Sequence, residues 1–431
     1  MFQLIGRLGL AYALLLAVFL SSLVLSALIP SEILRPNIGR TLLSLQGEGL
    51  YPSLALPWKN ITLDNDDEAV MYNIAYTSDA SRPLQSAMTN PRVAISTEEL
   101  DQIRNFEAMY AGTANVKILY ERYWHGYLVF LRPALTFLSY VEIRHALTAL
   151  LLLGTGWLLL LAKRRVGIKV SLALLFGLIV VDVPYVGQLI QFSSVFLIGL
   201  FASIYYLATY KKQKTAYALF FTVGGITSFF DLLTAPLIPL GLLLILSVCL
   251  DEEKRILEKC LAWVAGYSLL WSSKWFLAQW LFVPDALLSV TSRIFQRTTG
   301  YVDEGFNNTL AILQNVRELF SLNEAGFFAL LAIVFIGVVM LLRYGSWSIG
   351  RFRNIVPWLL VGATPYVWYF VLANHSYLHA WFTYRNQFMT IVALSIIFAE
   401  LVVWEHVRRD ILFLYRKLLH MRSLTNTSES S

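Results

Sequence analysis

The chain has 431 residues, of which 57% are hydrophobic and only 14% are charged, and its mean hydropathy is +0.60. This composition excludes an ordinary soluble domain, in which about 25% of residues are charged. The formal net charge of +6 does not indicate nucleic-acid binding, because the Lys and Arg residues lie in short segments between apolar runs. Cys249 and Cys260 lead us to expect neither a disulfide framework nor a zinc site.

Apolar runs recur as far as residue 404 and predict an all-α fold, a polytopic transmembrane helix bundle of about 10 spans. The first run is longer than the apolar region of a signal peptide, so we expect it to be an uncleaved span. The spans are expected at residues 8–29, 145–162, 168–186, 190–209, 215–230, 236–250, 258–283, 326–342, 355–373 and 386–404.

The basic residues predict the orientation of these spans, because cytoplasmic loops of membrane proteins are enriched in Lys and Arg. The basic clusters all fall on one side of the predicted bundle, in segments 163–165, 211–214, 254–259, 343–353 and 408–417. We therefore expect an integral multi-pass protein of a bacterial plasma membrane, with both termini in the cytoplasm.

Two long segments interrupt the pattern of short loops. Residues 30–144 form the first outer loop, and residues 284–325 form a second large outer loop. The end of the first loop is apolar but interrupted by charges, so we expect interfacial helices there, before the second span. Residues 1–404 are predicted to be one transmembrane domain. A cytoplasmic tail follows at 405–431, and its last residues, LTNTSESS, are expected to be disordered.

Four carboxylates stand close together in the first outer loop. Asp64, Asp66, Asp67 and Glu68 precede the apolar and aromatic run MYNIAY. Crowded carboxylates raise the pKa of one of their members, which suits a general base, and they can also bind a divalent cation. The alternative interpretation is a solvated acidic turn.

Charged residues also lie at or within the predicted spans. Asp182 follows the third span and Asp231 the fifth, and a carboxylate at that depth needs a cation, a hydrogen-bond donor or water. Both are candidate substrate-binding residues, with helix capping or an ion pair as alternatives. Lys274 places a charge inside the seventh span and is expected to face protein or a cavity.

Several cations on the outer side are candidates to bind an anionic ligand. Arg suits phosphate because its planar guanidinium donates two hydrogen bonds at once. The alternative for each residue is a side chain that extends to the membrane interface. The candidates are Arg122, Arg132, Lys274, Arg293, Arg297 and Arg385.

The histidines allow several interpretations. His375 and His379 are four residues apart, so a helix would place both rings on one face, at metal-ligand spacing. No matching Glu or Cys accompanies them, so substrate hydrogen bonding and aromatic packing are the alternatives. His125 has Tyr and Trp neighbours, which suits a sugar platform or an interfacial aromatic belt. No cofactor is certain, and a divalent cation is the one considered.

The arrangement resembles the C-type (GT-C) superfamily of membrane glycosyltransferases, which use polyprenyl-phosphate sugars outside the cytoplasm. The resemblance covers about residues 1–404 and is architectural. Its elements are a first span with its N-terminus inside, a long acidic first outer loop, interfacial helices before the second span, and an acid after the third. It implies a hexosyl- or pentosyltransferase whose base is a carboxylate of the first outer loop, here Asp64, Asp66, Asp67 or Glu68.

Physical reasoning agrees with a lipid-linked donor. Nucleotide sugars are cytoplasmic, so a transferase that faces outward needs a donor that crosses the membrane on a lipid. Asp66 or Asp67 would take the acceptor's proton, and Asp182 would bind acceptor or metal. The phosphate candidates are Lys274, Arg293, Arg297 and Arg385. The expected partners are a polyprenyl-phosphate-linked sugar, a glycan, lipid or protein acceptor of the cell envelope, and membrane lipids.

Two other classes remain open from the sequence. In a transporter or flippase for an anionic lipid-linked glycan, the cations would line a path and the carboxylates would relay protons, but no internal repeat is visible. A glycan polymerase, or an acyltransferase that uses His375 or His379, is the third reading. ATP-driven transport has no support, because no GxxxxGK[ST] loop is present.

Overall fold

The computed structural model describes residues 2–210, 216–251, 255–299 and 306–428, and the fold is all-helical apart from two small hairpins. The helices, in chain order, are α1 (Phe2–Ala27), α2 (Ser31–Glu48), α3 (Asn65–Thr77), α4 (Pro83–Thr89), α5 (Gln102–Ala111), α6 (Leu128–Leu135), α7 (Tyr140–Arg165), α8 (Ile168–Val180), α9 (Val183–Val186), α10 (Ile190–Thr209), α11 (Tyr217–Phe230), α12 (Leu237–Leu250), α13 (Ile256–Leu281), α14 (Ala286–Thr298), α15 (Asn308–Leu319), α16 (Glu324–Tyr344), α17 (Ile349–Val371), α18 (Ala373–Leu378), α19 (Ala380–Thr383), α20 (Phe388–Leu401) and α21 (Trp404–Ser428), with a 3₁₀ turn at Tyr384–Gln387.

A helix occupies each of the ten positions at which a span was predicted. Among the described residues, four of these helices are long and apolar enough to cross a membrane: α1, α7, α10 and α16. The helices α8, α11 and α12 are apolar but shorter. The predicted third span was too long at its end, because α8 stops at Val180 and the chain turns at Asp182, whose φ is +64°. The chain is therefore a helical membrane protein.

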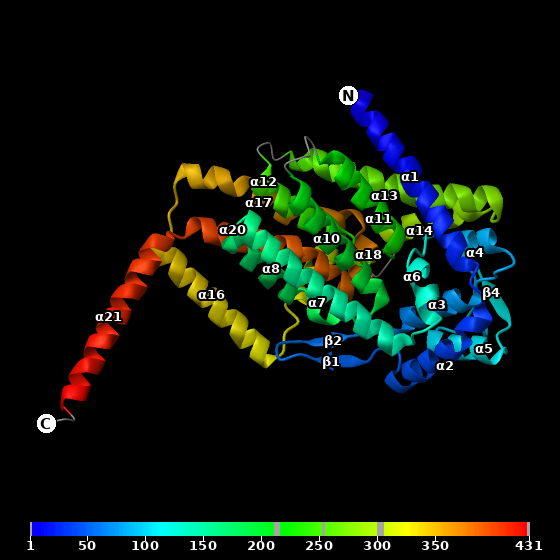
Figure 1. Ribbon diagram of the computed structural model, residues 1–431, viewed down its shortest axis with the longest axis horizontal. Coiled ribbons are helices and arrows are strands. Elements are labelled where there is room, and N and C mark those ends of the chain that lie inside the picture. Colours follow the sequence, from blue (N-terminus) through cyan, green and yellow to red (C-terminus); the bar gives the residue numbers. More distant parts are fainter. Residues whose placement is uncertain (1, 211–215, 252–254, 300–305, 429–431) are drawn as a thin grey trace.

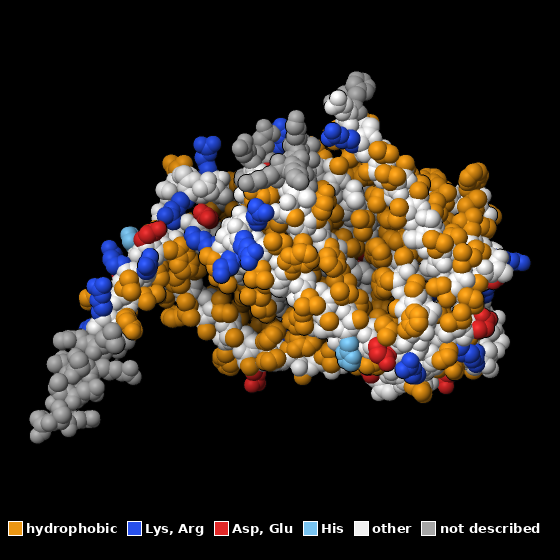
Figure 2. Space-filling model, in the orientation of Figure 1, with side chains coloured by type: hydrophobic (Ala, Val, Ile, Leu, Met, Phe, Trp, Pro, Cys, Tyr) orange, Lys and Arg blue, Asp and Glu red, His pale blue; other side chains and the backbone are white. Residues whose placement is uncertain are grey.

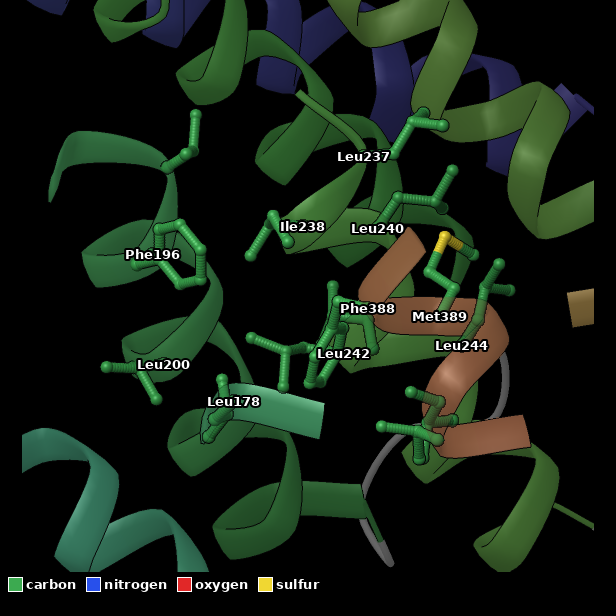
Figure 3. Packing of buried hydrophobic residues seen from close by; sticks show 14 of the residues in the cluster. Leu178, Phe196, Leu200, Leu237, Ile238, Leu240, Leu242, Leu244, Phe388 and Met389 are labelled. Atoms are coloured by element: carbon green, nitrogen blue, oxygen red, sulfur yellow. The ribbon is translucent and has the colours of Figure 1, made fainter. Parts of the chain in front are cut away.

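Helix α12 lies at the centre of the helical body. Its residues from Leu237 to Val248 are all buried, as an apolar sequence on every face requires. It packs against α10 and α20, and α20 in turn packs against α8 and α17. Figure 3 shows Leu242 beside Phe388 and Met389, between side chains of α8 and α10.

The surface of this body is largely apolar. Figure 2 shows hydrophobic side chains over most of the visible face, with the charged side chains gathered mainly near its margins. In α16 nearly every side chain is exposed, and Gly326 is its one buried residue. Exposed apolar helices of this length have their polar backbone groups satisfied internally and suit a hydrocarbon environment.

Residues 31–135 fold into a layer of helices that we call the cap (blue to cyan in Figure 1). It contains α2 to α6 and two antiparallel hairpins, β1 (Ser53–Ala55) with β2 (Asn60–Thr62) and β3 (Arg92–Ala94) with β4 (Val116–Ile118). Arg132, fully buried, joins the cap to the first span. Its guanidinium donates to the carbonyl oxygens of Ser26, Ile29 and Ala75.

The β1–β2 hairpin extends from the cap beneath the bundle toward α16 (Figure 1). Its tip, residues 56–59, is bound by the segment that precedes α16. Asn323 donates its backbone N–H to Trp58 O at 2.9 Å, and its side-chain amide to Pro57 O at 3.1 Å. The two segments predicted as large outer loops, residues 30–144 and 284–325, are therefore in direct contact.

The C-terminal segment is one helix, α21, which projects away from the body (Figure 1). The expected disorder of LTNTSESS is wrong for residues 424–428, which continue this helix; residues 429–431 lie outside the described residues. Helix α6 stands where helices were expected before the second span.

Candidate functional site

The predicted acidic cluster forms the N-terminus of α3. Asp64 is the N-cap: its Oδ1 accepts from Asp67 N at 3.1 Å, and its Oδ2 accepts from the amide of Gln191 at 2.9 Å. Asp66 Oδ1 accepts from Gln102 N at 3.0 Å. Carboxylates are favoured here because the helix N-terminus carries a partial positive charge and unpaired N–H groups. The carboxylate of Asp64 thus caps α3 and joins it to α10, and that of Asp66 joins α3 to α5 within the cap.

Asp67 differs from these neighbours, because its recorded side-chain partner among the described residues is another carboxyl group, that of Asp64, with which it shares a hydrogen bond. Burial, followed by the charge of Asp64, raises its pKa well above the usual range. Burial also raises the pKa of Asp66 to about 6. A raised pKa makes a carboxylate a stronger base, which can take a proton once it is ionised.

Glu68 lies one residue further along, fully buried against the start of α10. Its Oε1 accepts from Gln191 N at 3.2 Å, and its Oε2 has no partner in the described structure. Burial raises its pKa to about 8, so Glu68 holds its proton at neutral pH. Oε1 of Gln191 is also buried without a partner.

A group of cations and aromatic rings lies beside the acidic cluster. The guanidinium of Arg122 lies 4.8 Å from the ring of Tyr120, and that of Arg297 lies 5.6 Å from the ring of Tyr123. Arg92 links this group to the acids, because the charges of Asp66, Asp67 and Arg122 all act on its pKa, which burial lowers. No described carboxylate forms an ion pair with Arg92, Arg122 or Arg297.

Arg293 joins the same group from α14. It stands four residues before Arg297, so both project from one face of this helix. The charges of Arg122 and Arg297 contribute to lowering its pKa, after burial. An unpaired set of three arginines beside aromatic rings has the chemistry of a phosphate site.

Lys274 and Arg132 do not belong to this group. Lys274 is fully buried, as expected of a charge that faces protein, and it donates to Ala87 O at 2.6 Å, with the ring of Trp124 at 5.5 Å. Arg132 is saturated by three backbone carbonyls, so its contacts are structural and an anion has no access to it. His125 lies near Lys274, and burial lowers its pKa to about 3.

Asp182 is fully buried and forms an ion pair with Lys59, a partner that the sequence did not indicate. Nζ of Lys59, on the hairpin tip, lies 3.7 Å from Asp182 Oδ2, which also accepts from the hydroxyl of Tyr384. Burial lowers the pKa of Lys59. Arg385, the next residue along, lies 4.8 Å from the ring of Tyr384. This second polar group is formed by the cap hairpin and the helical body together.

Asp231 and the two histidines have mainly local partners. Asp231 accepts from the N–H groups of Leu233 and Thr234 at 3.0 and 2.9 Å, so its carboxylate stabilises the turn between α11 and α12 and caps neither helix. The rings of His375 and His379 are 4.8 Å apart, and His375 Nε2 lies 2.8 Å from Leu233 O. The charge of Arg297 acts on both histidines.

The residues that could hold a cation do not converge in the described structure. No group of three or more His, Cys, Asp or Glu side chains has a metal-binding arrangement among the described residues. The acidic cluster shows why: the carboxylates of Asp64, Asp66 and Glu68 point to different donors.

An apolar groove of about 1190 Å³ lies apart from this polar site, between α1, α6, α7, α10 and α11. Phe130, Leu147, Leu197 and Phe230 are among the side chains that line it, and none of the predicted site residues does. Its lining suits a hydrocarbon chain.

Sequence reasoning missed several residues of the site, among them Lys59, Arg92, Gln191 and Tyr384. Gln191 carried a usable signal, since it is an amide at the start of an apolar span. Lys59 and Tyr384 carried none, because each gains its significance from a segment distant in the sequence. Comparisons with protein-family models, with curated proteins and with solved structures find no match to this chain.

Proposed function

We propose that the chain is a membrane glycosyltransferase of the GT-C type, which moves a sugar from a polyprenyl-phosphate donor to an acceptor on the extracytoplasmic side. The proposal includes about ten spans, cytoplasmic termini and a cap outside the membrane. The observation that supports it best is Asp67, a carboxyl group at the N-terminus of α3 that shares a hydrogen bond with Asp64, with arginines beside it that form no ion pair in the described structure.

The chemistry follows from these two parts of the site. Asp67 takes the proton of an acceptor hydroxyl as that oxygen bonds to the anomeric carbon. The bond between the anomeric carbon and the phosphate oxygen breaks, and its electron pair stays on the departing lipid phosphate. Direct attack of this kind inverts the anomeric configuration. Arg122 and Arg297 stabilise the charge that develops on the phosphate.

The position of the arginine group on α14 supports the binding of a lipid phosphate. Arg293 and Arg297 belong to α14, which also carries exposed apolar side chains such as Leu288 and Phe295. An amphipathic helix of this kind suits the membrane interface, where the phosphate of a polyprenyl lipid lies. The lipid chain then stays in the bilayer and the sugar points toward α3.

The test compares Asp67→Asn with wild type in lipid nanodiscs that contain a polyprenyl-phosphate sugar. We expect the rate of transfer to fall by on the order of 10²–10⁴-fold, because the amide cannot accept the proton. Binding of the lipid donor should change little, since Asp67 does not contact its phosphate. Asp79→Asn, at an exposed carboxylate of the cap, is the matched control and should keep its activity.

A transporter predicts a different result. If wild-type protein moves lipid-linked sugar across the bilayer without forming a glycoside, and Asp67→Asn stops that flux, the chain is a transporter or flippase and the proposal fails.

A further inference from the structure

Arg385 is a buried guanidinium whose hydrogen bonds are mostly unmade. Its side chain belongs to a residue that is only 3% exposed, and its Nε has no partner in the described structure. Its recorded hydrogen bond, from Nη1 to Trp381 O, is long at 3.4 Å. Its Cζ lies 4.8 Å from the rings of both Phe192 and Tyr384. Aromatic faces orient a guanidinium but do not replace an anion.

No carboxylate among the described residues forms an ion pair with Arg385. Lys59 is paired with Asp182, and its Nζ lies 3.9 Å from the same Tyr384 ring. Lys59 also donates to the backbone carbonyl oxygen of Glu318 at 3.2 Å, and the charges of Asp182 and Glu318 both act on it. The two carboxylates thus act on Lys59, whereas the buried guanidinium of Arg385 has no ion-pair partner in the described structure. A buried charge without a partner is costly, which indicates that an anion completes the group.

A second donor is free beside Arg385. Asn386 accepts from Leu237 N through its Oδ1 at 3.0 Å, while its Nδ2 is buried without a partner in the described residues. A guanidinium N–H and an amide N–H on adjacent residues provide donors that suit two oxygens of a carboxylate or a phosphate.

This group is near the acidic cluster but separate from the arginines assigned to the donor phosphate. Phe192, on which Arg385 lies, follows Gln191, the residue bound to both Asp64 and Glu68. The donor arginines Arg122 and Arg297 contact the acids through Arg92 and Tyr120 instead. Helix α3 therefore begins between two cationic groups.

We infer that Arg385, Asn386 and Lys59 form a second oxyanion site, which binds a carboxylate or phosphate group of the acceptor. The role in the acceptor rests on the proposed transferase function. The site is lined by the helical body and the hairpin tip, and its groups are not those assigned to the donor phosphate, so we assign it to the acceptor. The acceptor class is thus an anionic saccharide.

The test measures equilibrium binding of three radiolabelled sugars to the full chain in nanodiscs without donor lipid: glucose 6-phosphate, glucuronate and glucose. We expect both charged sugars to bind more tightly than glucose. Arg385→Gln should weaken their binding by at least about tenfold and leave that of glucose unchanged. Arg385→Lys, which keeps the charge but not the planar fork, should recover part of the loss.

Arg104→Gln, at an exposed arginine of the cap, is the matched control and should bind all three sugars as wild type does. A preference for the phosphate sugar or for glucuronate identifies which anion the acceptor carries. Equal binding of glucose and the charged sugars, or unchanged binding in Arg385→Gln, overturns the inference.

A second measurement uses wild-type protein, in case Arg385→Gln does not fold. A structure determined with tungstate should show strong density beside Arg385 and Asn386, and density absent there overturns the site. Neither measurement involves transfer. If the charged sugars bind but no glycoside ever forms, the anion site stands and the transferase proposal fails.

Discussion

At the residue scale, the polar side chains inside this protein divide into those whose hydrogen bonds are complete and those whose bonds are not. Arg132 and Asp231 are complete, because backbone groups surround them. Glu68, Gln191 and Arg385 each keep a buried atom without a partner in the described structure. Such atoms are rare in folded proteins and point to a ligand or to water.

Glu68 makes the stability of the protein depend on pH. Its folded-state pKa of about 8 exceeds the ordinary value of 4.5, so the folded chain keeps a proton that the unfolded chain releases. The free energy of unfolding therefore falls as the pH rises from about 5 to about 8. In Glu68→Gln this contribution is absent, and the melting temperature should decline less over that range.

Thermal unfolding in detergent at several pH values checks this prediction. Glu107→Gln, at an exposed glutamate of α5, should keep the wild-type pH dependence. A slope in Glu68→Gln that matches wild type would show that Glu68 is ionised in the folded state at neutral pH.

At the scale of elements, two glycines set the distance between α11 and α13. A Cβ at Gly266 would overlap the carbonyl oxygen of Phe221, and a Cβ at Gly224 would overlap that of Trp263. The two helices can approach this closely because neither position has a side chain. This contact positions α13. The indole N–H of Trp271, on α13, donates to Arg122 O at 2.8 Å and so fixes the backbone of Arg122, one of the arginines proposed to bind the phosphate of the sugar donor.

Gly266→Ala should therefore separate α11 from α13. We expect a loss of stability of about 1–3 kcal/mol, the usual cost of overpacking, and a lower melting temperature. Gly156→Ala on α7 is the control, because nothing lies within 4 Å of the added Cβ. If both variants melt at the wild-type temperature, the close packing of α11 and α13 is not required.

At the scale of the whole molecule, the predicted topology puts the cap and the basic segments on opposite sides of the membrane. The polar groups of the site come from the cap and from the helix ends next to it. The use of a polyprenyl-phosphate donor requires this side to be extracytoplasmic. A measurement of which side of the membrane the cap faces therefore tests the proposed class of sugar donor as well as the topology.

Cysteine labelling tests the orientation, in a background with Cys249 and Cys260 replaced by serine. A membrane-impermeant maleimide should label Thr113→Cys, an exposed cap residue, in intact spheroplasts. It should label Arg164→Cys only after the membrane is permeabilised. The reverse pattern would place the cap in the cytoplasm and remove the reason for a lipid-linked donor.

The sequence by itself determined the features that depend on local pattern. Apolar runs predicted the helices, because a helix satisfies its own backbone groups within one segment. The acids before MYNIAY were recognised as a carboxylate cluster, but the sequence did not predict that they begin a helix, of which Asp64 is the N-cap. The expectation that Lys274 faces protein is confirmed, because a cation in an apolar span needs a partner.

Only the tertiary structure decided which polar groups are paired and which stay open. Lys59 meets Asp182, and Gln191 meets Asp64 and Glu68, across more than a hundred residues of sequence in each case. The sequence gives no signal for such pairs, because they depend on how the cap packs on the helical body. The same packing buries Asp67 beside Asp64, and it places Arg385 between two rings without an ion-pair partner in the described structure.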